Sequence, residues 1–526
     1  LGFTQLSTHP ADLFFSTPGV GPAIWLALKT GLIASLLSLL CCFVILTGLI
    51  HTSGFALLRR ALAALVAVPH SAIAIGLVFL LAPSGWLIRI LSPAITGFDR
   101  PPDWNFVPDP YGWGLILGLM AKEIPFLLMV SLAAMATLPA RQFAQIGSSL
   151  GYGRLTSWVV LILPLIYRQI RLPMIAVLVF SLSVVDMALL LAPTLPPPLA
   201  ILVIHGFLDA DLAARLPASF GAVLQIGLAV GGIFIWLLGE RLGRYMVQHW
   251  RRAGWRLRMA DRYLPAVSAI ALIPLLAACA GLVAALLWSV AGSWFFPNAL
   301  PQSLQLLHWQ DIASYGPLIR SSFLIAATAS LAALLLVLAW SYTASPKNFA
   351  NRWLLGCIFM PFFVPQISFL LGMQISLSRF GLDGSWLALI WVHMIFILPY
   401  TWLIVIPARQ ALDSRLDHVA ATLGASAWQR FRRIHLPVMA YPLGTALFIG
   451  ISVSVALYLP TVFVGAGRIN TITVEAVSLA AGGSRGPAGV AAMLQIAIPV
   501  LSFIMIHSWL RFRFAGFAGM RSGGLQ

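Results

Sequence analysis

Charged side chains are scarce in this sequence. Only 9% of its 526 residues are charged and 60% are hydrophobic, which gives a mean hydropathy of +0.94. Soluble globular domains carry about 25% charged residues, because their surfaces face water. The composition therefore excludes an ordinary soluble domain and indicates a membrane protein.

Residues that support metal or nucleotide binding are also few. The four cysteines all lie in hydrophobic runs and lack the paired spacing of a zinc site or a disulfide framework. None of the three lysines, Lys29, Lys122 and Lys347, follows a glycine as the lysine of a phosphate-binding P-loop does. The His-Glu-x-x-His pattern of metalloproteases is missing as well. We therefore predict a protein that is not an enzyme and that itself binds neither a metal nor a cofactor.

What the sequence has in abundance is hydrophobic runs. A helix that spans a bilayer needs about 20 apolar residues, because its backbone amides must pair within the helix. The sequence predicts eleven such spans, at residues 23–49, 61–81, 112–136, 172–191, 218–238, 264–290, 317–340, 353–375, 385–406, 441–457 and 489–510. We expect an all-α polytopic membrane protein.

The net charge of +17 comes from basic residues that gather in alternate loops. Seven arginines lie in the single stretch 241–262, whereas Asp99, Asp103 and Asp109 lie in a loop on the other side of the predicted membrane. Basic residues concentrate on the cytoplasmic side of membrane proteins. The charge is therefore a topology signal, with the start of the chain outside, and it does not indicate a nucleic-acid partner.

Two of the inner loops repeat each other. In each loop a glycine, Gly151 or Gly424, is followed thirteen residues later by a proline, Pro164 or Pro437, and the two loops are 273 residues apart. A repeat over half of the chain indicates duplication. We expect two homologous halves, residues 1–240 and 263–526.

The arrangement of the halves follows from the placement of the repeated loops. Both loops lie on the basic side, so the halves are parallel repeats whose pseudo-two-fold axis runs along the membrane normal. The basic stretch 241–262 would be a cytoplasmic linker between them. The first half has no counterpart of the span at 264–290, so we expect a further hydrophobic segment before Leu1 and twelve spans in the full protein.

The repeated loops resemble the EAA motif of permease subunits of binding-protein-dependent ABC importers. That motif reads Glu-Ala-Ala, three residues, Gly, nine residues, Ile, one residue, Leu-Pro. The positions that match it are Ala420, Gly424, Ile434, Leu436 and Pro437 in the second loop, and Gly151, Leu163 and Pro164 in the first. In the second loop His418 and Val419 replace the leading Glu-Ala, and in the first loop residues 145–147 replace the whole triplet. Two copies in one chain are similar to the fused permeases for ferric iron and thiamine.

The resemblance implies a transport function. In such importers each loop forms a short coupling helix that docks into a groove on a cytoplasmic ATPase, and two copies of that separate subunit bind ATP and magnesium. A substrate-binding protein outside the membrane delivers the solute. Small side chains at Ala420 and Ala421 would allow close approach of the ATPase, and Gly424 would take the left-handed conformation that ends one helix before the next. The implied location is the bacterial cytoplasmic membrane, with the chain surrounded by lipid.

Three charged residues lie within predicted spans: Lys122, Glu123 and Asp186. A charge at the centre of a bilayer costs about 2.5–3.5 kcal/mol on insertion scales. Two interpretations remain open, a gate or pathway between the halves and a buried structural ion pair. The alternative function is a secondary transporter with two six-helix halves, which would need no ATPase. The substrate does not follow from these residues.

Overall fold

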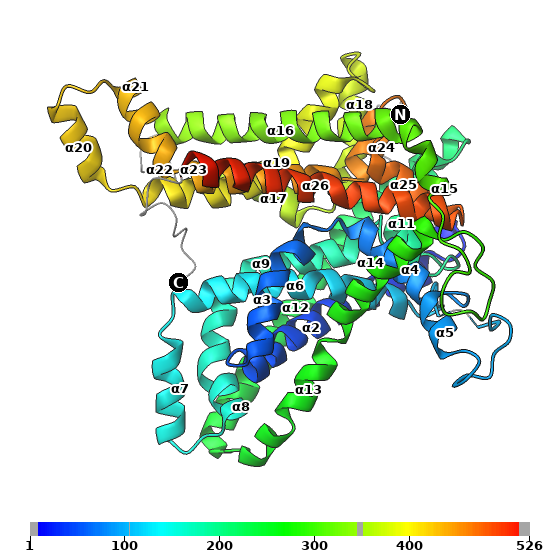
Figure 1. The fold of residues 1–526 in the computed structure, drawn as a ribbon, viewed down its shortest axis with the longest axis horizontal. Coiled ribbons are helices and arrows are strands. Elements are labelled where there is room, and N and C mark those ends of the chain that lie inside the picture. Colours follow the sequence, from blue (N-terminus) through cyan, green and yellow to red (C-terminus); the bar gives the residue numbers. More distant parts are fainter. Residues whose placement is uncertain (1–8, 105, 344–350, 515–526) are drawn as a thin grey trace. The chain divides into compact units, whose positions relative to one another are not determined.

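The computed structural model describes residues 9–104, 106–343 and 351–514, and these residues fold almost entirely into helices (Figure 1). Over these ranges β structure is confined to one isolated bridge between Ala291 and Leu304. Nine helices of the described residues are long and apolar enough to cross a membrane, and the number becomes eleven if two bent pairs are each one span. The prediction of an all-α polytopic protein is confirmed. Lys347 lies outside the described residues.

The helices of the first half run from α1 to α12. They are α1 (His9–Ser16), α2 (Val20–Leu49), α3 (Ser53–Ala67), α4 (His70–Leu81), α5 (Trp86–Leu91), α6 (Trp113–Ala136), α7 (Ala140–Ser149), α8 (Arg154–Ser157), the π-helix η1 (Trp158–Ile162), α9 (Leu163–Ser183), α10 (Ala188–Leu191), α11 (Leu199–Leu208), the 3₁₀ turn η2 (Leu212–Ala214) and α12 (Arg215–Ala253). The linker contains the 3₁₀ helix η3 (Arg258–Arg262).

The second half begins with α13 and ends with α26. Its helices are α13 (Leu264–Ala271), α14 (Ile273–Val290), α15 (Leu307–Gln310), the 3₁₀ helix η4 (Asp311–Tyr315), α16 (Gly316–Thr343), α17 (Arg352–Phe363), α18 (Gln366–Arg379), α19 (Trp386–Gln410), α20 (Ser414–Thr422), α21 (Ala427–Arg430), the π-helix η6 (Phe431–His435), α22 (Leu436–Val438), α23 (Ala440–Ala456), α24 (Leu459–Gly465), α25 (Ile472–Ala481) and α26 (Arg485–Arg513).

Three predicted spans differ from the structure. The span at 353–375 is bent by 109° between α17, which ends at Phe363, and α18, which begins at Gln366. The span at 61–81 is divided, because α3 ends at Ala67 and α4 begins at His70, with Val68-Pro69 between them. A proline has no backbone N–H and disfavours a helical residue before it, which accounts for the break. The fourth predicted span, 172–191, begins too late, because the helix runs over Arg154–Ser183.

The internal repeat is visible in the element boundaries. Helices α6 and α19 begin at Trp113 and Trp386, and α11 and α25 both begin and end 273 residues apart. The same spacing separates the two π-helices, η1 and η6. Such agreement over several elements confirms that the two halves repeat one structure.

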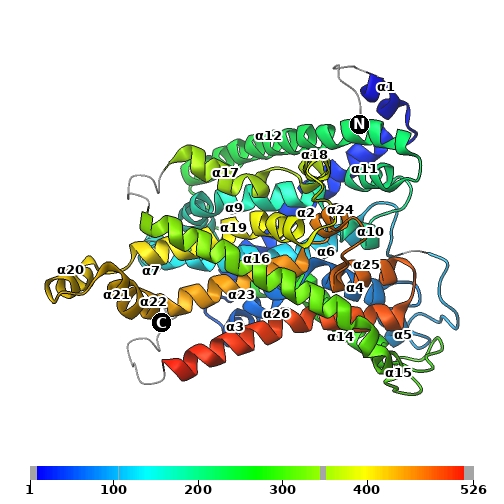
Figure 2. The same cartoon turned by 90° about the horizontal axis from the view of Figure 1, so that it is seen from above.

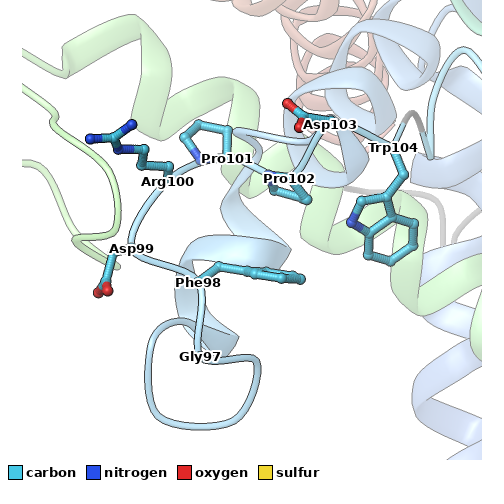
Figure 3. Close-up of a pocket in the computed structure, with 8 residues that line it drawn as sticks. All are labelled: Gly97, Phe98, Asp99, Arg100, Pro101, Pro102, Asp103 and Trp104. Atoms are coloured by element: carbon cyan, nitrogen blue, oxygen red, sulfur yellow. The ribbon is translucent and has the colours of Figure 1, made fainter.

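One connection breaks the repeat. From Pro69 to Trp113 the first half uses 23 residues more than the second half uses from Pro365 to Trp386. The additional residues form α5 and the loop that leads into α6. At the tip of this loop Phe98 and Trp104 point to one side, and Asp99 and Arg100 point to the other (Figure 3).

Packing divides the chain into two compact units. The first contains Leu1–Ile312, Phe362–Met373 and Ala476–Met493, and the second contains the rest. In the first unit α2 packs on α6 and α9, and α12 packs on α9 and α11 (Figure 2). In the second unit α16, α19 and α23 pack together. The sequence repeat divides the chain into a first half (1–240), a linker (241–262) and a second half (263–526), and the assignment of these ranges as domains stays a prediction.

A close approach of two helices fixes the position of α14 in the first unit. A Cβ atom on Gly76 of α4 would lie 2.6 Å from the carbonyl carbon of Gly281 on α14, so no side chain fits between these backbones. Small residues allow membrane helices to pack closely where the hydrophobic effect gives no drive. Helix α14, from the second half of the sequence, therefore packs against α4 from the first half.

Candidate coupling elbows and intramembrane charges

The second repeated loop forms a helical elbow, here called elbow 2 (residues 413–438). Helix α20 ends in a turn in which Gly424 has φ +81°, and α21, η6 and α22 follow. The N–H groups of Gly424 and Ala425 donate to the carbonyls of Ala421 and Ala420, both at 3.0 Å. This pair of bonds is the Schellman motif, which needs a left-handed residue and favours glycine. The predicted conformation of Gly424 is confirmed.

Elbow 2 exposes apolar side chains. Helix α20 has no buried residue, and Leu423 is 82% exposed. Leu416, Val419 and Trp428 are also exposed, and α20 and α21 extend beyond the end of α23 (Figures 1 and 2). Large exposed apolar patches on a protein mark interaction surfaces. The motif residues Ile434, Leu436 and Pro437 are half-buried at the base of the elbow, where η6 passes into α22.

A carboxylate holds the two arms of elbow 2 together. Asp417 on α20 accepts a hydrogen bond from His435 at 2.8 Å and lies 3.5 Å from the Arg430 guanidinium. The start of α21 is closed by a capping box, in which Ser426 and Gln429 bond each other's backbone N–H groups. Sequence reasoning missed these contacts. The Ser-x-x-Gln spacing at 426–429 was the available signal.

The first repeated loop forms the equivalent elbow 1 (residues 140–164). Gly151 has φ +79°, and the N–H groups of Gly151 and Tyr152 donate to the carbonyls of Ser148 and Gly147 at 3.0 and 2.9 Å. This is the same Schellman motif. Leu163 is buried where η1 passes into α9, and Pro164 is the second residue of α9, inside the helical run Arg154–Ser183. Pro164 has no N–H to donate to the Val160 carbonyl, which accepts a hydrogen bond from Arg251 instead.

Elbow 1 differs from elbow 2 in its surroundings. Ile146 on α7 and Leu150 directly after it are exposed, but the linker covers the turn and the start of α8. Arg258 donates to the Gly151 carbonyl at 2.8 Å, and Asp261 accepts from the backbone at Arg154 at 2.6 Å. Nothing in the sequence predicted that the linker has a fixed position on this elbow.

The intramembrane charges gather in the first unit. The Lys122 ammonium donates to the carbonyls of Leu65, Val66 and Val68 at 3.4, 2.6 and 2.5 Å. These carbonyls end α3, and the Pro69 break leaves them without partners in the helix. A cation at a helix C-terminus is also favoured by the helix dipole. For Lys122 the structural interpretation is therefore the better supported of the two.

Glu123 and Asp186 complete this cluster. Glu123 is buried and lies 4.0 Å from the His70 ring at the start of α4. Asp186 is buried in the non-helical turn between α9 and α10. The Lys122 charge interacts with both carboxylates. The structure thus brings the three predicted residues together beside two helix breaks, and a role in gating stays a prediction.

The second unit has a polar cluster of another kind. His393 on α19 is buried, with its two ring nitrogens 2.8 Å from the Ser454 hydroxyl and 3.2 Å from the Thr461 hydroxyl. Both hydroxyls come from neighbouring helices, α23 and α24, as is usual for polar groups in helix bundles. The charged cluster of the first unit is therefore not repeated in the second.

Two stretches have the letters Gly-x-Ser-x-Gly, residues 147–151 and 482–486, and neither forms a nucleophile elbow. In hydrolases that serine lies on a sharp turn from a strand to a helix. Here Ser149 donates to the Ile146 carbonyl within α7, and Ser484 lies in the helix-to-helix turn before α26. In the described ranges no group of three or more His, Cys, Asp or Glu side chains is placed to hold a metal.

Comparison with known proteins places these features in a family context. Residues 336–515, which include elbow 2, match the model of the family described as "Binding-protein-dependent transport system inner membrane component". The chain is 29% identical over 504 residues to the inner membrane ABC transporter permease protein YnjC of Escherichia coli K12, covering 95% of this chain and 90% of that protein.

Two other relatives match over shorter regions. The putative 2-aminoethylphosphonate transport system permease protein PhnV of Salmonella typhimurium is 26% identical over 159 residues, which are 30% of this chain and 60% of that protein. The molybdate/tungstate transport system permease protein WtpB of Thermococcus kodakarensis is 30% identical over 125 residues, 24% of this chain and 50% of that protein. Together with the helical spans described above, these similarities show a multi-pass transport permease of the cytoplasmic membrane, whose relatives are ABC transporter permeases.

Proposed function

We propose that this chain is the fused permease subunit of a binding-protein-dependent ABC importer, and that its two elbows dock onto two copies of a separate cytoplasmic ATPase. The observation that carries the proposal is the duplicated geometry. Each elbow has a left-handed glycine, Gly151 or Gly424, and each continues through a π-helix into a long membrane helix. π-Helical turns are rare and are frequently found at functional sites.

The geometry would allow each elbow, when it is moved, to move the membrane helix that follows it. The short helix of elbow 1 is continuous with its span, since Arg154–Ser183 is one helical run, and elbow 2 meets α23 through a bend of 70°. An amphipathic helix that lays its apolar face into a groove is a common mode of docking. ATP and magnesium, bound by the ATPase, would drive closure of its two copies and draw the elbows with them.

Alternating access sets the energy that this coupling must deliver. Moving a gate from 1:99 to 99:1 requires that the partners favour one state by about 5.5 kcal/mol. Two elbows acting together share that demand. The outer opening would receive a substrate-binding protein, in keeping with the description of the matched family as binding-protein-dependent.

The substrate is set by the binding protein in this proposal. Two motif copies in one chain favour a fused system of the ferric-iron or thiamine type, whereas two relatives are named for 2-aminoethylphosphonate and for molybdate or tungstate. These solutes differ in charge and size. We propose a small solute that is captured outside the membrane and handed to the permease.

The test removes the apolar contact of each elbow. Leu150 and Leu423 occupy equivalent positions before the two glycines, and both are exposed. A charge in a docking groove is unpaired and costly to bury, so Leu423→Asp should abolish copurification of the ATPase and solute uptake, and Leu150→Asp should weaken both. Leu195→Asp is the control, because Leu195 is 87% exposed in the proline-rich loop that the topology places outside.

A backbone variant tests the turn itself. Gly424→Pro cannot keep φ at +81°, because the proline ring fixes φ near −65°. Uptake should be lost while insertion into the membrane is kept. Uptake and ATPase copurification at wild-type levels in both Leu423→Asp and Gly424→Pro would refute the coupling assignment.

A further inference from the structure

The two elbows differ at the residue that begins the second short helix. Elbow 2 has Ser426 at this position and elbow 1 has Gly153, 273 residues earlier. The backbone is the same in both, with φ −68° and ψ 172° at Gly153 and φ −64° and ψ 161° at Ser426. Glycine is therefore not needed at 153 for its conformational freedom, since any residue adopts these angles.

The linker supplies the cap that Gly153 lacks. Asp261 accepts hydrogen bonds from the N–H groups of Arg154 at 2.6 Å and Leu155 at 2.8 Å. Aspartate is a favoured capping residue, and its charge suits the positive end of the long helix that starts here. A Cβ atom on Gly153 would lie 2.5 Å from the Asp261 carboxylate. The glycine leaves the space that the carboxylate fills.

Neighbouring residues of the linker strengthen this attachment. The Arg256 carbonyl accepts from the Thr156 hydroxyl at 2.9 Å and from the Gly153 N–H at 3.4 Å. Arg258 donates to the carbonyl of Gly151, the left-handed glycine of the elbow, at 2.8 Å. We call residues 256–261 the linker clip. It bonds the elbow at the turn, at the start of α8 and along its first turn.

We infer that the linker clip is a working part of elbow 1, with Asp261 as the positioning residue that replaces the serine cap of elbow 2. The inference rests on the proposed coupling function and extends it. Helix α13 begins at Leu264, three residues after Asp261, and α13 and α14 pack on α2 and α4. A displacement of elbow 1 by the ATPase is therefore passed to α9 through the π-helix and to α13 through the clip.

With the linker clip, the covalent fusion of the two halves has a function. A flexible tether would join the halves without transmitting movement. The clip instead ties the first elbow to the helix that opens the second half of the sequence. Elbow 2 needs no such support for its cap, because Ser426 and Gln429 provide it locally.

Reciprocal substitutions test the clip. Asp261→Ala removes the cap, and Gly153→Ser places a side chain against the carboxylate; each alone should lower ATP-dependent uptake about fivefold, the effect of losing one helix cap. The double variant Gly153→Ser with Asp261→Ala should recover to within about twofold of wild type, because the serine takes the freed space and caps the helix itself.

The controls separate this inference from the coupling proposal. Asp211→Ala removes a capping carboxylate at the 3₁₀ turn η2, away from the elbows, and should leave uptake unchanged. Membrane insertion and ATPase copurification are measured for every variant. If both single variants fail to insert and the double variant inserts and transports, the clip is supported. If the uptake of the double variant is reduced by the product of the two single-variant reductions, or if the double variant fails to insert, the clip is refuted. If the clip is refuted in this way while Leu423→Asp still abolishes uptake, only the clip inference fails and the coupling proposal stands.

Discussion

The contact between α4 and α14 gives a prediction whose magnitude follows from the structure. A Cβ atom on Gly76 would lie 2.6 and 2.7 Å from the carbonyl carbon and oxygen of Gly281 and 3.0 Å from the Leu282 nitrogen. All three are backbone atoms, which cannot rotate away, so the helices must separate by about 1 Å to reach ordinary van der Waals distance. Overpacking of this kind costs about 1–3 kcal/mol, and the better helix propensity of alanine offsets about 1 kcal/mol of it. Gly76→Ala should therefore lower the free energy of unfolding by about 1 kcal/mol.

The matched control is Gly227→Ala in the middle of α12, where an added Cβ meets no atom within 4 Å. There the propensity gain acts alone, so the two variants should differ by about 2 kcal/mol with opposite signs relative to wild type. The midpoint of SDS-induced unfolding in mixed micelles, followed by tryptophan fluorescence, measures the difference. A Gly76→Ala protein that is as stable as Gly227→Ala would show that the two backbones are not in contact.

Two further predictions concern the polar groups. Lys122→Met removes the donor that satisfies three carbonyls at the end of α3 and leaves Glu123 without its neighbouring cation, so we expect the free energy of unfolding to fall by about 3 kcal/mol. The control Lys29→Met removes only a cation–π contact and should lower it by less than about 1 kcal/mol in the same assay. Equal losses in the two variants would argue against the capping role of Lys122. Asp417→Asn weakens the hydrogen bond to His435 that holds the two arms of elbow 2 together. The affinity of the detergent-solubilised permease for its ATPase should fall about tenfold, measured as binding of the ATPase to the immobilised permease. An unchanged affinity would show that the elbow is rigid without the Asp417–His435 bond.

The placement of the fourth span shows where hydropathy alone is insufficient. Arg168 and Arg171 interrupt the apolar run, so the sequence predicts a start at 172, whereas α9 already begins at Leu163. In the structure Arg171 is 2.9 Å from Glu240 on α12, and Tyr167 donates to the same carboxylate at 2.7 Å. Polar residues within the helix are thus paired by a helix about 70 residues away in the sequence, and no local window can detect that.

The same limit applies to the candidate site. From the sequence, Lys122 is a charge that is costly to place within a membrane span. Only the break between α3 and α4 in the structure shows the carbonyls to which it donates. The sequence around Gly153 indicates no special role for this glycine, and only the position of Asp261 in the structure shows why a side chain is excluded there. In both cases the partner lies far along the chain, at 54–57 residues for Lys122 and 107 for Asp261.

The sequence by itself determined the membrane class, the all-helical fold, the duplication and the left-handed conformation of Gly424, because each depends on composition or on a pattern that repeats locally or at a fixed interval. Only the tertiary structure decided that α14 packs on α4, that the intramembrane charges meet at helix breaks, and that the linker caps elbow 1. These features depend on which distant segments pair, and pairing is set by backbone approach and by hydrogen-bond partners that the linear order of residues does not contain.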